Sequence, residues 1–84
     1  MESDKSRQFR PVGFAMHAIG RYSVVRSVEE AAAELLKHWP TDDGEAYLEA
    51  IKMCHDAMHD RATPEQVRRA LIKAAHEANI MVMQ

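Results

Sequence analysis

Two histidines four residues apart, His55 and His59, have the spacing in this chain that comes nearest to a metal-binding pattern. On a helix this spacing places both imidazoles on one face, as in helical zinc sites. A metal needs a third ligand, but Cys54 and Asp56 each point about 100° away from His55 at 3.6 residues per turn. Lys52, one turn earlier on the same face, would repel the metal cation. A solvated helix face is therefore favoured, with a metal-binding protein acting through His55 and His59 as an alternative.

Cys54 is the single cysteine, and a catalytic thiol would need an exposed thiolate with a nearby base. It lies instead on an apolar helical stripe between Ile51 and Met58, where cysteine behaves as a small hydrophobic residue. A structural role is favoured. One cysteine also excludes an internal disulfide, which is typical of a reducing compartment, so we expect a cytoplasmic protein.

The other common site chemistries are missing from the sequence pattern. There are no paired carboxylates in distinguishable surroundings and no serine, histidine and aspartate arrangement. Only three glycines are present, which makes a phosphate-binding loop improbable. We therefore expect no catalytic, cofactor-binding or metal-ligating residues, no cofactor, and a protein that is not an enzyme.

Composition indicates one small soluble domain. The chain has 84 residues, of which 46% are hydrophobic and 29% charged, as in ordinary folded proteins. A domain of this size buries only about 60–65% of its unfolded surface, so its own core gives little stability and a homodimer is expected. Residues 1–26 carry five basic and two acidic side chains, whereas residues 27–84 carry six and eleven. The acidic body argues against nucleic acid, and no apolar run approaches the roughly 20 residues of a membrane span.

The first part of the chain is predicted to contain a β-hairpin. Residues 1–10 are polar and without periodicity, so we expect a disordered lead-in followed by a single domain over 11–84. An alternating apolar pattern, continued beyond a turn at Gly20, consists of Val12, Phe14, Met16, Ala18, Tyr22 and Val24. Because a hairpin alone is barely stable, the face of Phe14 and Met16 is expected to lie on helices.

The first predicted helix begins at a capping box formed by Ser27 and Glu30. Its expected buried stripe consists of Val28, Ala31, Ala32, Leu35 and Leu36. The helix is expected to end near Trp39, because Pro40 disfavours the helical conformation of the residue before it. Trp39 is predicted to be a buried anchor between helices.

Two more helices are predicted, over about 44–60 and from a second capping box at Thr63-Pro64. The expected stripe of the second consists of Tyr47, Ala50, Ile51, Cys54, Ala57 and Met58. That of the third consists of Val67, Ala70, Leu71, Ala74, Ala75 and Ala78. Asn79 suits a left-handed helix end. Beyond it, Ile80 and Val82 are expected either to cover the hairpin or to form a short C-terminal strand, which makes an α+β fold.

The signposts Ser27-Val28-x-Glu30, Trp39-Pro40 and Pro64-Glu65-x-x-Arg68, together with Tyr47, resemble those of a known family. It consists of short alpha-proteobacterial proteins, common in rhizobia, catalogued as domain of unknown function 982. The resemblance covers roughly residues 9–82. It implies a hairpin followed by three helices, and it implies no known activity.

The sequence therefore favours a non-catalytic protein-interaction or regulatory module, acting on itself or on another protein. Self-association is expected through a hairpin edge or an apolar patch with Ile80 and Val82. A cluster of Met81, Val82 and Met83 would form an adaptable binding surface if it is exposed. The alternative is a nucleic-acid-associated regulator that uses a basic flank on the third helix, formed by Arg68, Arg69, Lys73 and His76.

Overall fold

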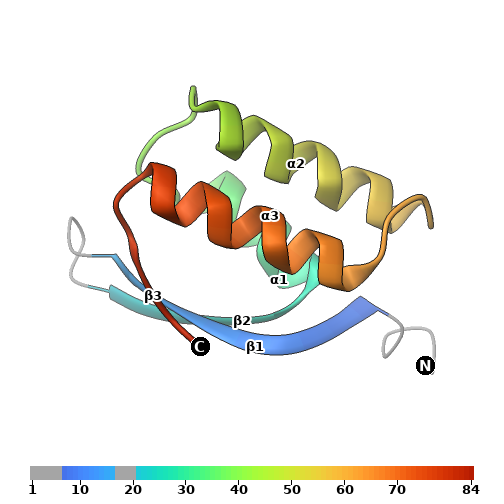
Figure 1. Ribbon diagram of the computed structural model, residues 1–84, viewed down its shortest axis with the longest axis horizontal. Helices are drawn as coiled ribbons and strands as arrows, with labels where there is room; N and C mark the ends of the chain where they lie inside the picture. Colours follow the sequence, from blue (N-terminus) through green and yellow to red (C-terminus); the bar gives the residue numbers. More distant parts are fainter. Residues whose placement is uncertain (1–6, 17–20) are drawn as a thin grey trace.

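A computed structural model describes residues 7–16 and 21–84 of the chain as an α+β fold (Figure 1). In chain order, its elements are β1 (Gln8–Met16), β2 (Arg21–Ser27), α1 (Val28–Lys37), α2 (Glu45–Met58), α3 (Pro64–Glu77) and β3 (Met81–Met83). The predicted hairpin, the three helices and the C-terminal strand are thus confirmed. The disorder expected at the N-terminus concerns residues that lie largely outside the described part, although β1 already begins at Gln8.

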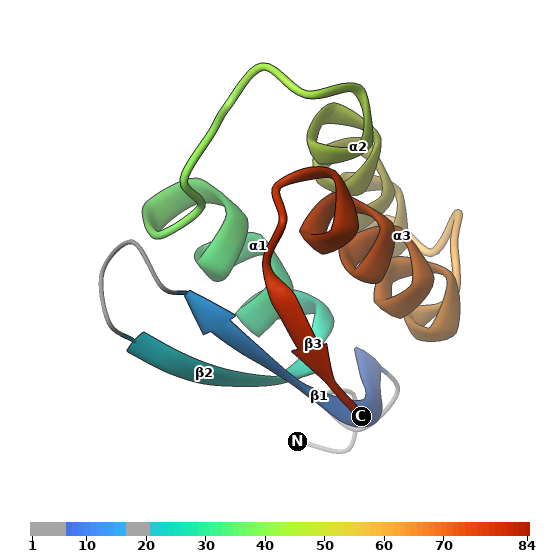
Figure 2. The same cartoon turned by 60° about the vertical axis from the view of Figure 1, so that its left-hand side comes forward.

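The three strands form one antiparallel sheet in the order β2, β1, β3. All three helices lie on the same side of this sheet (Figures 1 and 2). Helix α3 packs on β1 and β3, α1 packs on β2, and α2 packs on α1 and α3. The opposite face of the sheet is covered by none of the helices.

The core lies between the sheet and the helices. Phe14 is fully buried on the inner face of β1, and its neighbours Val12 and Val25 come from the two hairpin strands. The helical contribution consists of Val28, Ala31, Leu35, Tyr47, Ala50, Cys54, Ala57, Val67, Ala70, Leu71, Ala74 and Ala75. Many of these residues are alanines, so the helices can approach one another closely.

Local capping residues fix where the helices begin. The Ser27 hydroxyl accepts a hydrogen bond from the Glu30 amide at 3.1 Å, as expected. The Glu30 carboxylate accepts from the amide of Arg26 rather than from that of Ser27. At α3, Thr63 and Gln66 form both hydrogen bonds of a capping box. The left-handed conformation predicted for Asn79 is confirmed by its φ of 60°.

The face assignment of the second strand was wrong. Tyr22 and Val24 point to the uncovered side, whereas Ser23 and Val25 are buried against the helices. The β1–β2 register decides this, since it places Ser23 opposite Phe14 and therefore on the same face. The side chain of Met16 lies outside the described residues.

One further burial prediction was wrong, and another was right only in part. Leu36 was expected in the stripe of α1, but 69% of it is exposed because this side of the helix has no neighbour to cover it. Ile80 is buried in the core, which agrees with its expected place over the hairpin but excludes it from the apolar patch proposed for self-association. The exposed residues at the C-terminus are Met81 and Met83, which flank the half-buried Val82.

Trp39 was expected to be an anchor between helices, but its aromatic partner, Phe14, lies on the sheet. Its ring meets that of Phe14 edge to face, with 5.9 Å between the ring centroids. The residue is partly buried and follows directly on the last turn of α1. It therefore ties the end of α1 to the central strand.

We expect Trp39→Ala to lower the free energy of unfolding by about 2–4 kcal/mol, because a partly buried aromatic ring and an edge-to-face pair are lost. Leu36→Ala is the matched control, since this exposed leucine should change the free energy by less than about 0.5 kcal/mol. Urea denaturation followed by circular dichroism measures both. Equal destabilisation by the two substitutions would contradict the burial pattern of α1 and the segment that follows it.

Candidate functional site

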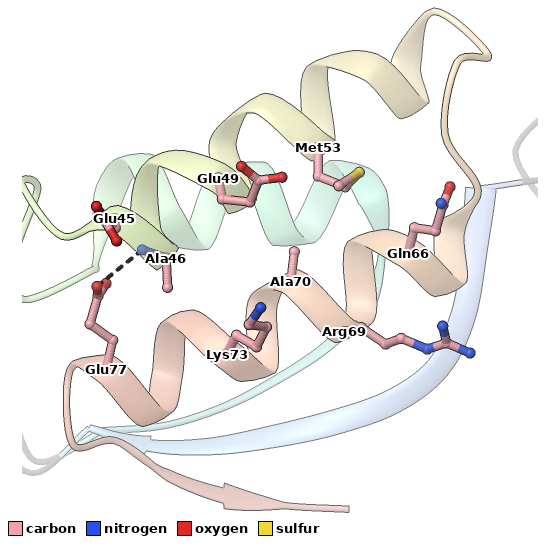
Figure 3. Close-up of a pocket in the computed structure, with 9 residues that line it drawn as sticks. All are labelled: Glu45, Ala46, Glu49, Met53, Gln66, Arg69, Ala70, Lys73 and Glu77. Carbon is pink, nitrogen blue, oxygen red and sulfur yellow. Dashed lines mark hydrogen bonds between the residues drawn. The ribbon is translucent and has the colours of Figure 1, made fainter.

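A groove of about 770 Å³ lies between α2 and α3 (Figure 3). Side chains of both helices form it, and none of them comes from a strand. From α2 they are Glu45, Ala46, Glu49 and Met53, and from α3 they are Gln66, Arg69, Ala70, Lys73 and Glu77. No local sequence pattern predicts this groove, because the two halves of its lining lie on separate helices.

Glu77 closes one end of the groove and caps α2. Gly44 occupies the N-cap of α2 and has no side chain that could accept a hydrogen bond. The carboxylate of Glu77 takes over this role, accepting from the amides of Ala46 at 3.0 Å and Tyr47 at 3.1 Å. A negative charge at this end of a helix is also favourable to the helix dipole. The two helices are thus joined by a polar contact as well as by apolar packing.

Opposite charges line the two sides of the groove. Glu45 and Glu49 stand on α2, and Arg69 and Lys73 stand on α3; all four are exposed (Figure 3). In the described part of the chain, no nitrogen of these two cations lies within 4 Å of a carboxylate oxygen of α2. Between the two charged sides lie Ala46, Met53 and Ala70. The groove therefore offers a narrow apolar floor between an acidic and a basic rim.

A second surface is the outer face of the sheet, which carries two rows of uncharged residues. The register places Tyr22 and Met81 on either side of Ala15, and Val24 and Met83 on either side of Gly13. Tyr22 is 60% exposed and Met81 57%. The contiguous face is therefore apolar and open to solvent, which is unusual for a monomer if it is extensive.

Gly13 lets Tyr22 lie flat across this face. A Cβ atom at position 13 would come within 2.6 Å of the Tyr22 hydroxyl oxygen. Gly13 is consequently buried, although it belongs to the uncovered face. The Tyr22 ring therefore fills the space above Gly13 and forms part of the outer surface of the sheet.

Arg68 does not belong to the exposed basic flank that the sequence predicted. It is only 4% exposed, and its Nε donates to the carbonyl of Arg10 at 2.8 Å. Its Nη2 donates to the side-chain carbonyl of Gln84 at 3.2 Å. The Oε2 atom of Glu65 lies 3.5 Å from Nε of Arg69. Arg68 therefore holds α3 against the sheet, and the exposed flank is reduced to Arg69, Lys73 and His76.

The histidine pair lies together on the surface of α2, as its spacing predicts. The ring centroids of His55 and His59 are 4.5 Å apart, and both residues are exposed. In residues 7–16 and 21–84, no group of three or more His, Cys, Asp and Glu side chains is placed to share a metal. Lys52, on the same face, pairs with Asp56 at 3.9 Å.

Several buried polar atoms cluster around the end of α1. Glu34 is buried, and its Oε1 lies 3.5 Å from Nδ1 of His38. Its Oε2, the Ser23 hydroxyl and the Trp39 indole nitrogen have no hydrogen-bond partner among the described residues. The apolar pattern of α1 does not predict these buried polar groups, because it ends in Leu35 and Leu36 and does not indicate that the neighbouring Glu34 is buried.

Cys54 is buried in the core, as expected, which raises the pKa of its thiol to about 11. Desolvation is the cause, because burial disfavours the thiolate. A thiol in this state is a poor nucleophile at neutral pH.

The cap supplied by Glu77 predicts that two substitutions are coupled. Glu77→Ala should destabilise the protein by about 1–2 kcal/mol, the usual loss for a helix cap. Gly44→Ser should change the stability little, since its Cβ displaces the flexible end of the Glu77 side chain while its hydroxyl replaces that cap. In the Glu77→Ala background, however, Gly44→Ser should stabilise, because serine can then cap α2 itself. A double-mutant cycle by urea denaturation measures this, and simple additivity of the two changes would contradict the proposed cap.

The raised pKa of Cys54 predicts slow alkylation. At pH 8 a thiol of pKa near 11 is about 0.1% thiolate, against about 10% near pKa 9, so iodoacetamide should react about 100-fold more slowly with the folded chain than in urea. Folding stability should also fall as the pH rises above about 9, because the unfolded state then loses the proton first. Leu48→Cys in a Cys54→Ala background provides an exposed thiol for comparison. Equal reaction rates of the two thiols would show that Cys54 is accessible.

Comparison with known proteins identifies the family. The family model described as "protein of unknown function (DUF982)" matches residues 10–82, which is most of the chain. No curated protein and no solved structure was found to match the chain. The family match includes β1 from Arg10 onward, β2, all three helices and the first two residues of β3. The chain therefore belongs to the DUF982 family of proteins of unknown function.

Proposed function

We propose that this protein is a non-catalytic interaction module that works as a dimer of identical chains, joined through the outer faces of their sheets. The observation that carries the proposal is the pair of uncharged rows across all three strands. They expose Tyr22, Val24, Met81 and Met83 on the side that no helix covers. Burying these side chains against an apolar surface would be favourable.

A second copy is the partner that fits this face best. The two rows contain no charged residue, so a charged partner surface would lose its hydration without gaining an ion pair. An identical face avoids this loss, and a two-fold axis allows the same patch to serve on both chains. The flexible side chains of Met81 and Met83 can adjust to the facing sheet of the other chain, since methionine adapts to irregular gaps. The small size of the core supports the same conclusion.

The patch differs from the one expected from the sequence. Ile80 is buried, so it cannot contribute, and Val82 faces the helices. β3 also occupies the edge of β1 opposite Gly13–Ala15, so that side of the hairpin is already paired. The proposal therefore rests on the sheet face and on Met81 and Met83 rather than on edge pairing.

The nucleic-acid alternative has less support than before. With Arg68 buried, the exposed cations of the α3 flank are fewer, and Glu65 partly neutralises Arg69. The body also keeps its net negative charge. Binding to duplex DNA is expected to be weak and to decline with salt by a slope of about −0.9 per neutralised phosphate.

The metal alternative rests on His55 and His59 alone. Their ring spacing is compatible with a shared ion, but two exposed imidazoles form only part of a site. Among the described residues, no helix is long and apolar enough to cross a membrane.

The test compares the oligomeric state of the native protein with those of two variants, Met81→Lys and Leu48→Lys. We expect light scattering between micromolar and submillimolar concentrations to show a concentration-dependent dimer for the native sequence. Met81→Lys should weaken dimerisation at least 10-fold, because it places a charge in the buried face. Leu48→Lys is the matched control, since Leu48 is 55% exposed on α2 and away from the sheet. A native chain that stays monomeric throughout, or equal weakening by both substitutions, would refute the sheet-face dimer.

A further inference from the structure

The groove between α2 and α3 has the shape of an unfilled helix-packing site. Its lining extends from Glu45 to Met53 on α2 and from Gln66 to Glu77 on α3, so the groove is about 12–17 Å long at 1.5 Å per residue. Its floor is low where Ala46 and Ala70 lie, because alanine extends little from the backbone. The side chain of Met53 lies further along the floor and can adjust to what packs on it.

The backbone hydrogen bonds that the groove can offer decide the secondary structure of a segment that binds in it. Both walls are helices, whose backbone groups are paired internally, and no strand edge lies in the lining. An extended peptide placed there would leave its own backbone groups unpaired. A helix satisfies its backbone internally and buries only side chains. The groove therefore fits about two to three turns of a helix.

The rims set the charge pattern of the partner. The α2 rim carries Glu45 and Glu49, and the α3 rim carries Arg69 and Lys73. The pair of Arg69 with Glu65 is exposed and contributes little, so Arg69 can turn to a new partner. We infer that the groove binds an amphipathic helix of another protein, with an apolar seam, cationic side chains toward α2 and anionic side chains toward α3. The groove recognises such a partner by which flank of its helix is cationic and which is anionic. The net charge of the partner helix has little effect on binding.

A second copy of the groove fits less well than a different protein. The hydrogen bonds of Glu77 to the start of α2 place Glu45 and Glu77 at the same end of the groove. A two-fold axis along the helices would pair the acidic rim of each copy with the basic rim of the other, but it would set Glu45 over Glu77 at one end and place one hollow over another, which leaves both unfilled. A two-fold axis across the helices would set each acidic rim over its own counterpart, which disfavours binding.

This inference does not depend on the dimer, because the groove and the sheet face share no residue. If the sheet-face dimer also forms, it has two grooves, one on each chain. Both grooves lie on the helical side of their chain, which the dimer contact does not cover. Partners linked in pairs would then bind with increased avidity.

The test is selection from a displayed library of short designed helices with a fixed apolar seam and flanks randomised between Glu and Lys. We expect the native protein to enrich helices with lysines on one flank and glutamates on the other. The charge-swapped variant Glu49→Lys/Lys73→Glu keeps the net charge, so it should bind these helices at least 10-fold more weakly. In its own selection it should enrich helices whose charges are exchanged only at the positions that face residues 49 and 73, because Glu45 and Arg69 are unchanged.

The control is Lys37→Glu/Asp42→Lys, a charge swap at exposed positions outside the groove, which should bind as the native chain does. Circular dichroism of every variant verifies that the helices are intact. If the swapped chain does not fold, Met53→Asp replaces it and should abolish binding. Enriched helices with randomly arranged flanks, equal affinity for the native and swapped chains, or no enrichment by the native chain would overturn the inference.

Discussion

The structure depends on the packing of one face of a three-stranded sheet against three helices. Phe14 is at the centre of this layer, fully buried on the middle strand and in edge-to-face contact with Trp39. A chain of 84 residues has enough helix to cover one side of its sheet, and the other side remains open. The uncovered face is thus a direct consequence of how the core is built.

Two charged residues of α3 hold this helix in place at both of its ends. Arg68 reaches the carbonyl of Arg10, next to Pro11, where the register of β1 and β2 shifts. This irregular stretch can contain a proline because Pro11 lies beyond the part of β1 that pairs with β3. Glu77, at the other end, caps α2. Hydrogen bonds from charged groups are stronger than neutral ones, so both contacts help to set the position of α3 between the sheet and α2.

The two candidate surfaces differ in the physical property on which each would depend. The sheet face is uncharged and broad, so association through it would be driven by the burial of apolar area. The groove is narrow and flanked by opposite charges, so specificity there would come from the order of charges around a small apolar floor. One surface is suited to holding identical chains together, and the other is suited to selecting a different partner.

Much of the fold follows from local signals in the sequence. Ser27, Thr63 and Asn79 mark helix ends because each satisfies backbone groups within a few residues, and these assignments agree with the structure. The helical stripes are also largely correct, and so is the buried Cys54, because an apolar period of 3.6 residues defines which side of a helix is buried.

The tertiary structure alone decided the properties that depend on residues distant in the sequence. The spacing of apolar residues along α1 predicts a broad apolar side. Whether Leu36 on that side is buried depends on whether another helix packs against it. Arg68 and Arg10 are 58 residues apart, and Glu77 and Ala46 are 31 apart, so no local pattern could pair them. The groove and the sheet face are likewise made of residues that become neighbours only when the helices and strands pack. The sequence by itself therefore determined the elements and most of their buried sides, and the packing of those elements determined which surfaces remain for partners.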